Sequence, residues 1–477
     1  MSEGLSVVLD LGKTLSKLSL WSPSGTMLAR RTRLNDRHVA MLGGQSVRVL
    51  DAMGIEAWAE EVLREFAGLG RVARIIPVGH GAAAAILRDG ALAAAALDYE
   101  QLIPAEYVAA YHKQRDPFAH TGSPALPDGL NLGLQLHFLD LLDPALLSGD
   151  ATILPWPQYW AWCFSGVAAS EVTSFGCHSD LWCPATAEPS RLARRRGWAA
   201  RFAPLRRAGE AIGTITTDWV RRTGLPPDVA VHCGLHDSNA ALLAARGFAE
   251  IAGHEATVLS TGTWFVAMRT PGIGVHVDLA ALSEARDCVV NVDVHGTPIP
   301  SARFMGGREI ELLTGIDARR IDINPDQPAI IAALPGVVST GAMVLPTLTP
   351  GVGPFPIGAN RWVNRPRDAI ELRAAVCLYA ALVADAALEL IGARERVLVE
   401  GRFGEALAFV RTLATLRPDL RFFVSNQRND VSYGALRLIA PWLSPPSALS
   451  EVQPLDCDLV GYAARWRAQA TGDSEAA

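Results

Sequence analysis

The chain is poor in cysteine, and its cysteines form no pattern. Its 477 residues include seven cysteines, an odd number, with no C-x-x-C pair among them. This argues against a disulfide framework and against a structural zinc site. We expect the cysteines to act as small buried hydrophobic side chains in a reducing compartment, as in a cytoplasmic protein.

Charge is also scarce, at 19% of residues with a formal net charge of −6. Such a chain has no general attraction for nucleic acid. The basic run Arg194–Arg196 is typical of a solvated helix face. No apolar run reaches the roughly 18 residues of a membrane span, and the N-terminus lacks the basic and apolar segments of a secretory signal. We therefore expect neither nucleic acid nor a membrane as a partner.

Apolar residues are abundant, at 49% of the chain, which provides for a large core. The length suggests roughly two to four domains. The apolar pattern predicts strands at Leu5–Leu11, Lys17–Trp21, Met27–Arg33, Ala73–Val78 and Val229–Cys233, and helices at Ile55–Phe66 and Ser238–Ala245. Tyr99 to Pro155 is rich in proline and is expected to be mostly loop.

The opening pattern then occurs a second time. Strands are expected at Ala256–Leu259 and Trp264–Arg269, joined by a small polar turn, and helices follow, the longest at Asp368–Ile391. Two α/β domains that each begin with strand, turn and strand indicate a duplicated fold. We place the boundary near Gly247–Glu255.

The first turn has the composition of an anion site. Asp10 ends the strand, Gly12 allows close backbone approach, and Lys13, Thr14 and Lys17 supply charge, a hydroxyl and N–H groups. A carboxylate beside such a turn could hold Mg²⁺, usually through water. An ordinary hairpin with surface lysines explains the same residues, so the turn alone decides nothing.

The second turn, Ser260-Thr261-Gly262-Thr263, has one glycine and three hydroxyls. Two such turns at the starts of two halves are what a nucleoside triphosphate held between domains would require. A third feature is Asp237, which follows a predicted strand and begins a predicted helix. The helix dipole keeps a carboxylate ionised there, and an ionised carboxylate can accept a proton from an attacking hydroxyl. A plain N-cap aspartate is the alternative.

Together these residues resemble the FGGY carbohydrate kinases, over nearly the whole chain and in the expected order. Asp10, Gly12, Thr14 and Lys17 match the family pattern D-x-G-T-T-x-x-K. The other two patterns are G-x-x-D-x-x-A, matched by Gly234, Asp237 and Ala240, and S-x-G-T, matched by Ser260, Gly262 and Thr263. Lys13 replaces the usual first threonine, a variant associated with a fuculose-kinase-like or rhamnulose-kinase-like branch.

The resemblance implies an α/β fold of two duplicated actin-like (ribonuclease H-like) domains with an interdomain cleft. Residues 1–247 would bind sugar and phosphate, and residues 248–477 would bind the nucleotide. The implied reaction is ATP-dependent phosphorylation of a small sugar, with Asp237 as the catalytic base and Mg²⁺ near Asp10 and Asp237. The ATP-binding residues would be Gly12, Lys13, Thr14, Lys17, Ser260, Thr261, Gly262 and Thr263.

The adenosine motif departs from the family pattern, which has a glycine triplet. Here the strand Arg396–Val399 is followed by a turn that keeps only Gly401 and Gly404, and Asn426 lies near the position that lines the nucleotide pocket in the family. These three residues are the expected base-side contacts. The departure leaves base recognition, and with it the choice of nucleotide, open.

For the sugar, the resemblance points to a glycine-containing loop and a W-x-D-like segment. Imidazole, carboxylate and phenol groups suit a polyol, because they hydrogen-bond adjacent hydroxyls while an aromatic face covers the C–H side. The expected substrate-binding residues are His80, Gly81, Asp98, Tyr99, Glu100, Gln158 and His236. For His80 a buried core histidine is an equal alternative.

The sequence does not name the sugar. L-Fuculose, L-rhamnulose, a pentulose or a polyol are the candidates, and a homodimer is one assembly that the resemblance allows. The main alternative is a sugar-responsive regulatory or binding protein that kept the fold and lost turnover, which the altered adenosine motif favours and the intact Asp10 and Asp237 oppose. An Hsp70-like or actin-like ATPase is a third class, opposed by the lack of a peptide-binding module after residue 440.

Overall fold

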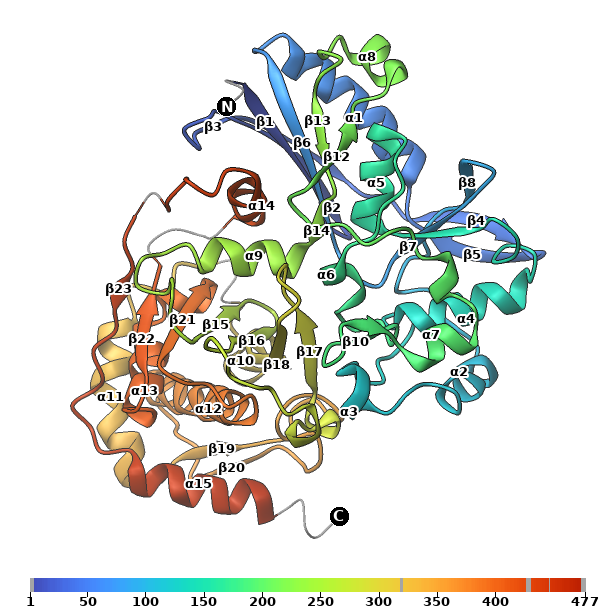
Figure 1. Ribbon diagram of the computed structural model, residues 1–477. Coiled ribbons are helices and arrows are strands. Elements are labelled where there is room, and N and C mark those ends of the chain that lie inside the picture. Colours follow the sequence, from blue (N-terminus) through green and yellow to red (C-terminus); the bar gives the residue numbers. More distant parts are fainter. Residues whose placement is uncertain (1–3, 318–320, 426–429, 446, 473–477) are drawn as a thin grey trace. The chain divides into compact units, whose positions relative to one another are not determined.

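The computed structural model describes residues 4–317, 321–425, 430–445 and 447–472. The chain forms two compact units, each of which is discontinuous in sequence (Figure 1). Unit 1 comprises Met1–Ala244, Val290–Pro298 and Asp430–Ser444, and unit 2 comprises Ala245–Val289, Ile299–Asn429 and Pro445–Ala477.

Unit 1 is built on a mixed sheet with the strand order β12-β13-β6-β1-β2-β3, and β14 also pairs with β6. β1 is antiparallel to β2 and parallel to β6. The strands are β1 Leu5–Leu11, β2 Leu15–Trp21, β3 Met27–Leu34, β6 Val72–Gly79, β12 Ala211–Thr214, β13 Ala230–His232 and β14 Leu235–His236. The central strands are buried on both faces, as in sheets covered on each side by helices.

Alternate residues of β1 contact different helices. Val7 and Leu9 face a cluster with α1 (Ala52–Ala67) and α5 (Trp156–Ser165). Val8 faces a second cluster, which includes residues of α9 (Asp237–Ala245) and α14 (Val431–Ile439). Because side chains alternate along a strand, Asp10 lies on the same face as Val8. The face of the sheet that carries Asp10 is therefore the face covered by α9.

The segment between Tyr99 and Pro155 is more helical than the sequence predicts. It contains α2 (Ala105–His112), the short α3 (Phe118–Thr121) and α4 (Leu132–Leu142). α4 is buried along most of its length, with Leu134 and Phe138 in a hydrophobic cluster. A helix buried on every side, here with Gln135 and His137 among its buried residues, has no single apolar stripe to reveal it, which is why the sequence pattern did not predict α4.

The other elements of unit 1 are small. They form a sheet of order β8-β7-β9, two hairpins and short helices. Their bounds are β4 His38–Leu42, β5 Gln45–Val49, β7 Ala84–Arg88, β8 Ala91–Ala94, β9 Thr152–Pro155, β10 Trp182–Cys183, β11 Glu188–Pro189, α6 Val172–Phe175, α7 Arg191–Arg195 and α8 Thr217–Thr223.

Unit 2 repeats the arrangement at the centre of unit 1. Its sheet has the order β17-β18-β16-β15-β21-β22-β23, and β15 is antiparallel to β16 and parallel to β21. The strands are β15 Ala256–Thr261, β16 Phe265–Thr270, β17 Cys288–Val292, β18 Pro298–Phe304, β21 Arg396–Gly401, β22 Arg421–Val424 and β23 Ser450–Glu451. The two sheets share one plan, which is the duplication that the sequence predicts.

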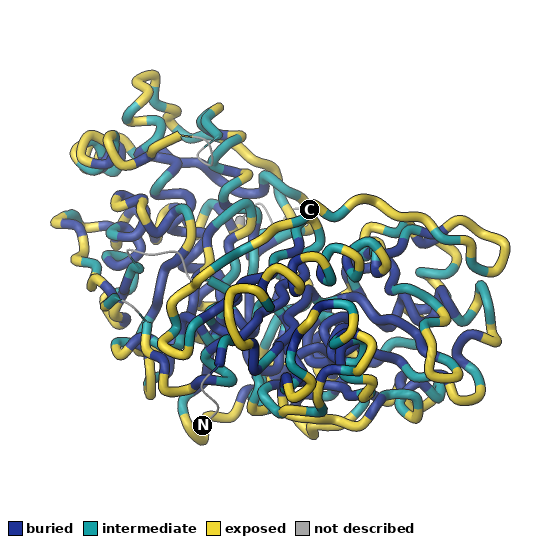
Figure 2. The backbone as a smooth tube through the Cα atoms, turned by 90° about the horizontal axis from the view of Figure 1, so that it is seen from above, coloured by how far each residue is buried: buried dark blue, intermediate teal, exposed yellow. Residues whose placement is uncertain are grey.

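A long buried helix forms the centre of the helical layer in unit 2. α12 (Ala369–Leu390) begins at Asp368, whose carboxylate accepts hydrogen bonds from two backbone N–H groups, and it follows the expected Asp368–Ile391 closely. Most residues of α12 are buried, and Figure 2 shows buried stretches of backbone lying inside exposed ones. The other elements are α10 Gly306–Thr314, α11 Gln327–Thr340, α13 Leu407–Leu416, α15 Val460–Gly472, β19 Met343–Leu345, β20 Arg361–Val363 and the 3₁₀ turns Leu279–Ala281, Glu284–Arg286 and Arg402–Glu405.

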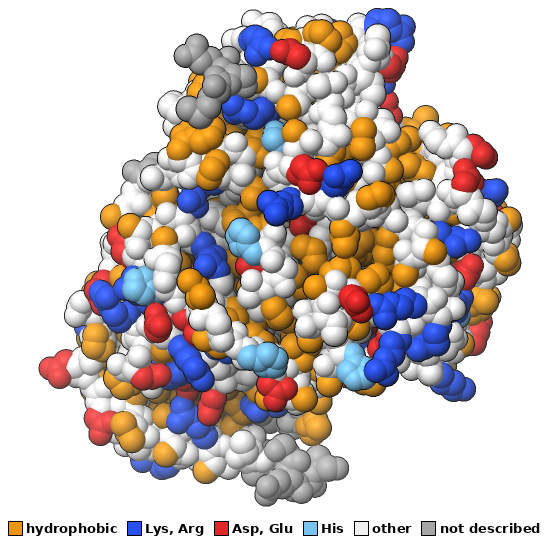
Figure 3. Space-filling model, in the orientation of Figure 1, with side chains coloured by type: hydrophobic (Ala, Val, Ile, Leu, Met, Phe, Trp, Pro, Cys, Tyr) orange, Lys and Arg blue, Asp and Glu red, His pale blue; other side chains and the backbone are white. Residues whose placement is uncertain are grey.

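Surface charges of both signs are interspersed over much of the face seen in Figure 3. The arginine run of α7 follows this pattern, because Arg194, Arg195 and Arg196 each form an ion pair with a carboxylate. All seven cysteines are free. Among the described helices, none is long and apolar enough to cross a membrane.

Candidate active site

The turn Gly12–Thr14, which the sequence predicts to bind phosphate and which we call the first phosphate turn, joins β1 to β2. The Gly12 N–H donates to the Leu15 carbonyl at 3.1 Å, which closes the turn. A Cβ at Gly12 would lie 2.9 Å from the same oxygen, so a larger residue would force the turn apart. In the described part of the chain the backbone N–H groups of Lys13 and Thr14 have no hydrogen-bond acceptor. Consecutive free N–H groups of this kind form an anion site.

Asp10 ends β1 as a buried carboxylate, 3% exposed. Lys17 lies opposite it on β2, with Nζ 2.8 Å from Oδ2. Burial raises the pKa of Asp10, Lys17 opposes this rise, and the nearby carboxylates of Asp237 and Asp430 add to it. Asp10 is therefore a carboxylate that a further cation would stabilise in its ionised form.

Asp237 begins α9 directly after β14. The preceding Gly234 has φ +84°, and a Cβ there would lie 2.3 Å from the Pro77 carbonyl oxygen, so only glycine fits. The Asp237 side chain is 30% exposed. Burial raises its pKa, while His80 and the hydrogen bonds from Ser238 lower it. The result is a partly accessible carboxylate with a stronger affinity for a proton than a surface aspartate has.

Two histidines flank this carboxylate. His236 Nε2 lies 3.3 Å from Asp237 Oδ1, and burial lowers the pKa of His236 to about 4, so the ring is neutral at pH 7. Gly81 allows this ring to approach, because a Cβ at Gly81 would lie 2.9 Å from His236 Nε2. The sequence-predicted residues Gly81 and His236 are thus brought together beside Asp237.

His80 is neutral as well, because burial lowers its pKa. Its Nδ1 lies 2.8 Å from the Gly81 carbonyl oxygen. A carbonyl can only accept, so Nδ1 carries the proton and Nε2 is the acceptor. Nε2 is buried and has no partner among the residues that the structure describes. His80 therefore offers one acceptor suited to a hydroxyl group.

Lys13 lies among the residues expected to contact sugar. Its Nζ is 2.5 Å from Asp98 Oδ1 and 2.9 Å from Glu100 Oε2, and it lies 4.5 Å from the centre of the Tyr99 ring. The Tyr99 ring meets His80 edge-on at 5.3 Å. Burial, and then Glu100, raise the pKa of Tyr99 to about 12. Lys13 thus joins the phosphate turn to the Asp98–Glu100 segment.

Gln158, expected at the sugar, lies in α5 and is wholly buried. Its Nε2 donates to the carbonyl oxygens of Gly234 at 3.0 Å and Cys233 at 3.3 Å. The amide therefore holds the segment that leads into Asp237. Its Oε1 is buried and unpaired within the described ranges.

The second predicted phosphate turn, at the end of β15 in unit 2, is hydrogen-bonded to Gly401–Glu405, the turn that the sequence predicts to bind adenosine and that we call the adenosine turn. The Thr261 hydroxyl donates to the Glu400 carbonyl at 2.5 Å and accepts from the Phe403 N–H at 3.0 Å. Gly401 has φ +82°, and a Cβ there would lie 2.2 Å from the Thr261 carbonyl oxygen. Thr261 and Gly401 therefore fix one turn against the other.

The start of α10 packs on the same turn. A Cβ at Gly307 would lie 2.0 Å from the Gly262 carbonyl oxygen, so this contact requires glycine. The Thr263 carbonyl accepts from the Arg308 N–H at 3.4 Å, and Ser260 is exposed. In the adenosine turn, a Cβ at Gly404 would lie 3.1 Å from the Val399 carbonyl oxygen. Asn426 lies outside the described residues.

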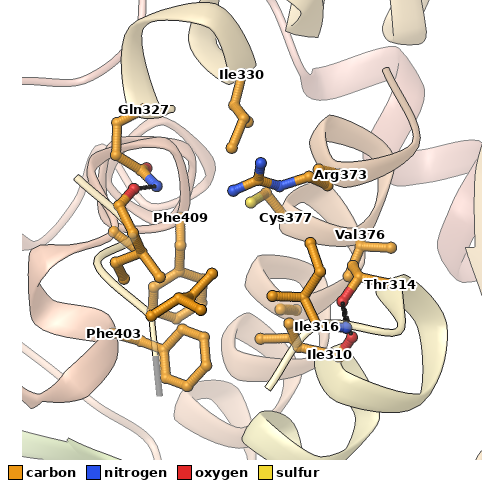
Figure 4. Close-up of a pocket in the computed structure, with 14 residues that line it drawn as sticks. Ile310, Thr314, Ile316, Gln327, Ile330, Arg373, Val376, Cys377, Phe403 and Phe409 are labelled. Carbon is orange, nitrogen blue, oxygen red and sulfur yellow. Dashed lines mark hydrogen bonds between the residues drawn. The ribbon is translucent and has the colours of Figure 1, made fainter. Parts of the chain in front are cut away.

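A pocket with a volume of about 60 Å³ opens beside the predicted adenosine turn that follows β21 (Figure 4). Phe403 of that turn and Phe409 of α13 lie together on its wall, and Ile310 from α10 also lines it. Gln327 is already bonded at both ends of its amide, to the Ile323 carbonyl and the Ala408 N–H. The walls are mainly apolar, as a site for the faces of an aromatic ring would be.

No group of three or more histidine, cysteine or acidic side chains forms a metal site within the described residues. Mg²⁺ in phosphoryl-transfer sites uses one or two carboxylates, together with phosphate oxygens and water. Burial raises the pKa of both carboxylates, and the charge of Asp237 raises that of Asp10 further. The residues present therefore fit a Mg²⁺ bound largely through a substrate.

Sequence reasoning missed Asn35 and the pair Glu171 and Thr173. Asn35 bonds to the first phosphate turn. Thr173 accepts from the His236 N–H at 3.0 Å and donates to Glu171 at 2.5 Å. A lone asparagine after a strand or a threonine in a short helix is no signal in the sequence, because only the folded chain brings these groups to the site.

Comparison with known proteins settles the family. Residues 253–446 match the family model described as the C-terminal domain of FGGY carbohydrate kinases. A carbohydrate kinase from Novosphingobium aromaticivorans is 58% identical, with a TM-score of 0.94, and the match covers 99% of this chain and 100% of the other. The chain belongs to the FGGY carbohydrate kinases.

Two more distant kinases share the fold of this chain. A xylulose kinase from Lactobacillus acidophilus is 12% identical with a TM-score of 0.75, covering 99% of this chain and 97% of the other. A Plasmodium falciparum glycerol kinase solved with ADP is 11% identical with a TM-score of 0.77, covering 99% of each chain. These likenesses confirm the predicted fold class of two actin-like domains. Among curated proteins, no sequence matches.

Proposed function

We propose that this carbohydrate kinase transfers the γ-phosphoryl group of ATP to a hydroxyl of a small sugar, with Asp237 as the general base. The observation that carries the proposal is the place of Asp237: it begins α9, stays partly accessible and has a raised pKa beside two neutral histidines. A base of this kind accepts a proton most effectively when its pKa approaches the working pH.

The chemistry uses few groups. As the sugar oxygen forms its bond to phosphorus, the bond to the β-phosphate oxygen breaks, ADP leaves with the electron pair, and the hydroxyl proton passes to Asp237. The free N–H groups of Lys13 and Thr14 would hold phosphate oxygens, and Lys17 adds positive charge beside Asp10. Positioning and charge stabilisation provide most of the rate in such transfers.

Mg²⁺, held near Asp10 and Asp237, would neutralise charge on the phosphates when bound. On the sugar side, His80 Nε2 would accept from one hydroxyl, and the neutral His236 would keep Asp237 oriented. Gly81, Asp98, Tyr99, Glu100 and Gln158 are the remaining proposed sugar-side residues.

In unit 2 we assign the cavity beside Phe403 to the adenine base. It adjoins the adenosine turn, which Thr261 bonds to the second phosphate turn. Gly401 and Gly404 would shape this site, with Ser260, Gly262 and Thr263 as phosphate contacts. Apolar walls suit the faces of a base.

For the substrate we propose a ketose, with L-fuculose, L-rhamnulose and pentuloses such as xylulose or ribulose as the members to test, together with polyols. The test is ADP release measured with ATP, Mg²⁺ and each sugar in turn, beside a thermal-shift screen, because a ligand of the folded state raises apparent stability. Turnover with one of these sugars supports the proposal. Sugar and nucleotide binding without any ADP release would favour a regulatory protein instead.

A further inference from the structure

Asn35 lies in the connection between β3 and β4, directly beside the first phosphate turn. Its side-chain Nδ2 donates to the Gly12 carbonyl at 2.7 Å and to the Lys13 carbonyl at 3.3 Å. Its own backbone N–H donates to the Thr14 carbonyl at 3.0 Å. One residue therefore binds all three carbonyl oxygens of the turn.

The orientation of the Asn35 amide is itself fixed. Its Oδ1 accepts from the Ser16 hydroxyl at 2.9 Å and from Arg33 Nη1 at 3.2 Å. With donors on that side, Nδ2 must face the turn. Ser16 is fully buried, so the arrangement has a rigid support.

Anchored carbonyls have a direct effect on the free N–H groups. In a planar trans peptide the C=O and the N–H point in opposite directions. The Gly12 carbonyl shares its peptide with the Lys13 N–H, and the Lys13 carbonyl shares its peptide with the Thr14 N–H. When Asn35 holds both oxygens, both N–H groups point away from it, and no carbonyl oxygen faces an incoming phosphate.

The geometry points to Asn35 as the positioning residue that presets the first phosphate turn for the terminal phosphates of the nucleotide. This inference rests on the proposed function, because it takes the turn to bind phosphate. Asn35 itself touches no reacting atom, and its effect passes through the two peptide units. Without it, the turn would have to expend binding energy to reorient its carbonyls each time that a nucleotide binds.

The test is Asn35→Asp, which keeps the size of the side chain and replaces the donor with an oxygen that repels both carbonyls. Losing two hydrogen bonds and leaving the carbonyls unpaired should weaken ATP binding roughly ten- to hundredfold. The KM for ATP should rise by this factor while the KM for sugar stays unchanged. Asn35→Ala removes the donor without adding charge and should show the same split, less strongly, in case the aspartate variant does not fold.

Two comparisons separate positioning from general damage. Affinity for AMP, which lacks the terminal phosphates, should not change in Asn35→Asp. The matched control is Asn364→Asp, because Asn364 also donates its amide to a backbone carbonyl, that of Thr340, on an exposed surface of unit 2. The control should keep wild-type constants for both substrates.

Nucleotide affinity is measured by titration calorimetry, so the result does not depend on turnover. Equal ATP affinity in wild type and both Asn35 variants overturns the inference, and so does an equal loss of ATP and AMP affinity. If the wild type binds ATP but phosphorylates no sugar, the proposed function fails while the affinity comparison still decides the role of Asn35. If the wild type binds no ATP, both fail.

Discussion

Asp237→Asn is the substitution that examines the proposed reaction most directly. Asparagine keeps the shape of the side chain and its place at the start of α9, but it cannot take a proton. His236, 3.3 Å from the carboxylate oxygen, and the Ser238 contacts can remain. A general base contributes about 10²–10⁴-fold, which is about 2.7–5.4 kcal/mol of the activation barrier. We expect kcat to fall by that factor with little change in sugar affinity.

The assay is coupled ADP release with the best sugar of the panel, and sugar binding is followed separately by thermal shift. Asp368→Asn is the control, since Asp368 also begins a helix, α12, on the surface of unit 2. It should retain full activity, because asparagine caps a helix about as well as aspartate. If Asp237→Asn retains clearly more than about a hundredth of wild-type kcat, which is the lower bound of about 10² for a base, the assignment is refuted.

The pH profile gives the same prediction an independent check. A base acts in its deprotonated form, so kcat/KM should be full above the pKa of Asp237 and fall as the pH drops through it. Burial raises this pKa, so the fall begins at a higher pH than for an ordinary aspartate. A profile of the asparagine variant that keeps the same acidic limb would assign that limb to another group.

The other predictions concern the turns and one buried acid. Lys13→Met breaks the ion pairs with Asp98 and Glu100, so the KM for sugar should rise more than the KM for ATP. The opposite ranking would indicate that the Lys13 side chain serves nucleotide binding. Gly401→Ala places a Cβ 2.2 Å from the Thr261 carbonyl oxygen at φ +82°, which should lower stability by about 1–3 kcal/mol; an unchanged melting temperature would contradict the contact. Burial raises the pKa of Glu171 to about 7, so its protonated form stabilises the fold below an unfolded pKa of about 4.3, and this contribution is lost as the pH rises through 7. Glu171→Gln should therefore remove that loss and raise the melting temperature at pH 8 relative to wild type, and an equal pH dependence in both proteins would exclude Glu171 as the cause.

Local patterns predicted much of the fold because they depend on neighbours in the chain. Leu5–Leu11 is a strand as expected, the strand expected at Lys17–Trp21 begins two residues earlier at Leu15, and the long helix begins at its Asp368 cap. The helix α4 was missed because it is buried on every side, polar Gln135 and His137 included, so its apolar residues mark no single face. The helix α11, which contains Pro335, was missed as well. Hydrophobic periodicity reveals an element only where one of its faces is apolar and the other is polar.

The candidate site divides in a similar way. Asp10, the turn Gly12–Thr14 and Asp237 were found because a glycine or a carboxylate at the end of a strand has a recognisable spacing. The ion pair between Lys13 and Asp98 could not be predicted from local spacing, because the two residues lie 85 positions apart in sequence. The role of Asn35 could not be predicted either, because an asparagine after a strand is common in turns of any kind.

The sequence by itself determined the duplicated strand-turn-strand plan, the two small-residue turns and the single carboxylate that begins α9. These follow from local preference: alternating apolar residues form strands, and glycine permits φ values and close contacts that other residues do not. The tertiary structure alone decided the tautomer of His80, the raised pKa of Asp237 and the hydrogen bonds from Asn35 to the first phosphate turn. Each depends on burial and on hydrogen bonds between residues distant in the chain, and those arise only when the sheets and helices pack.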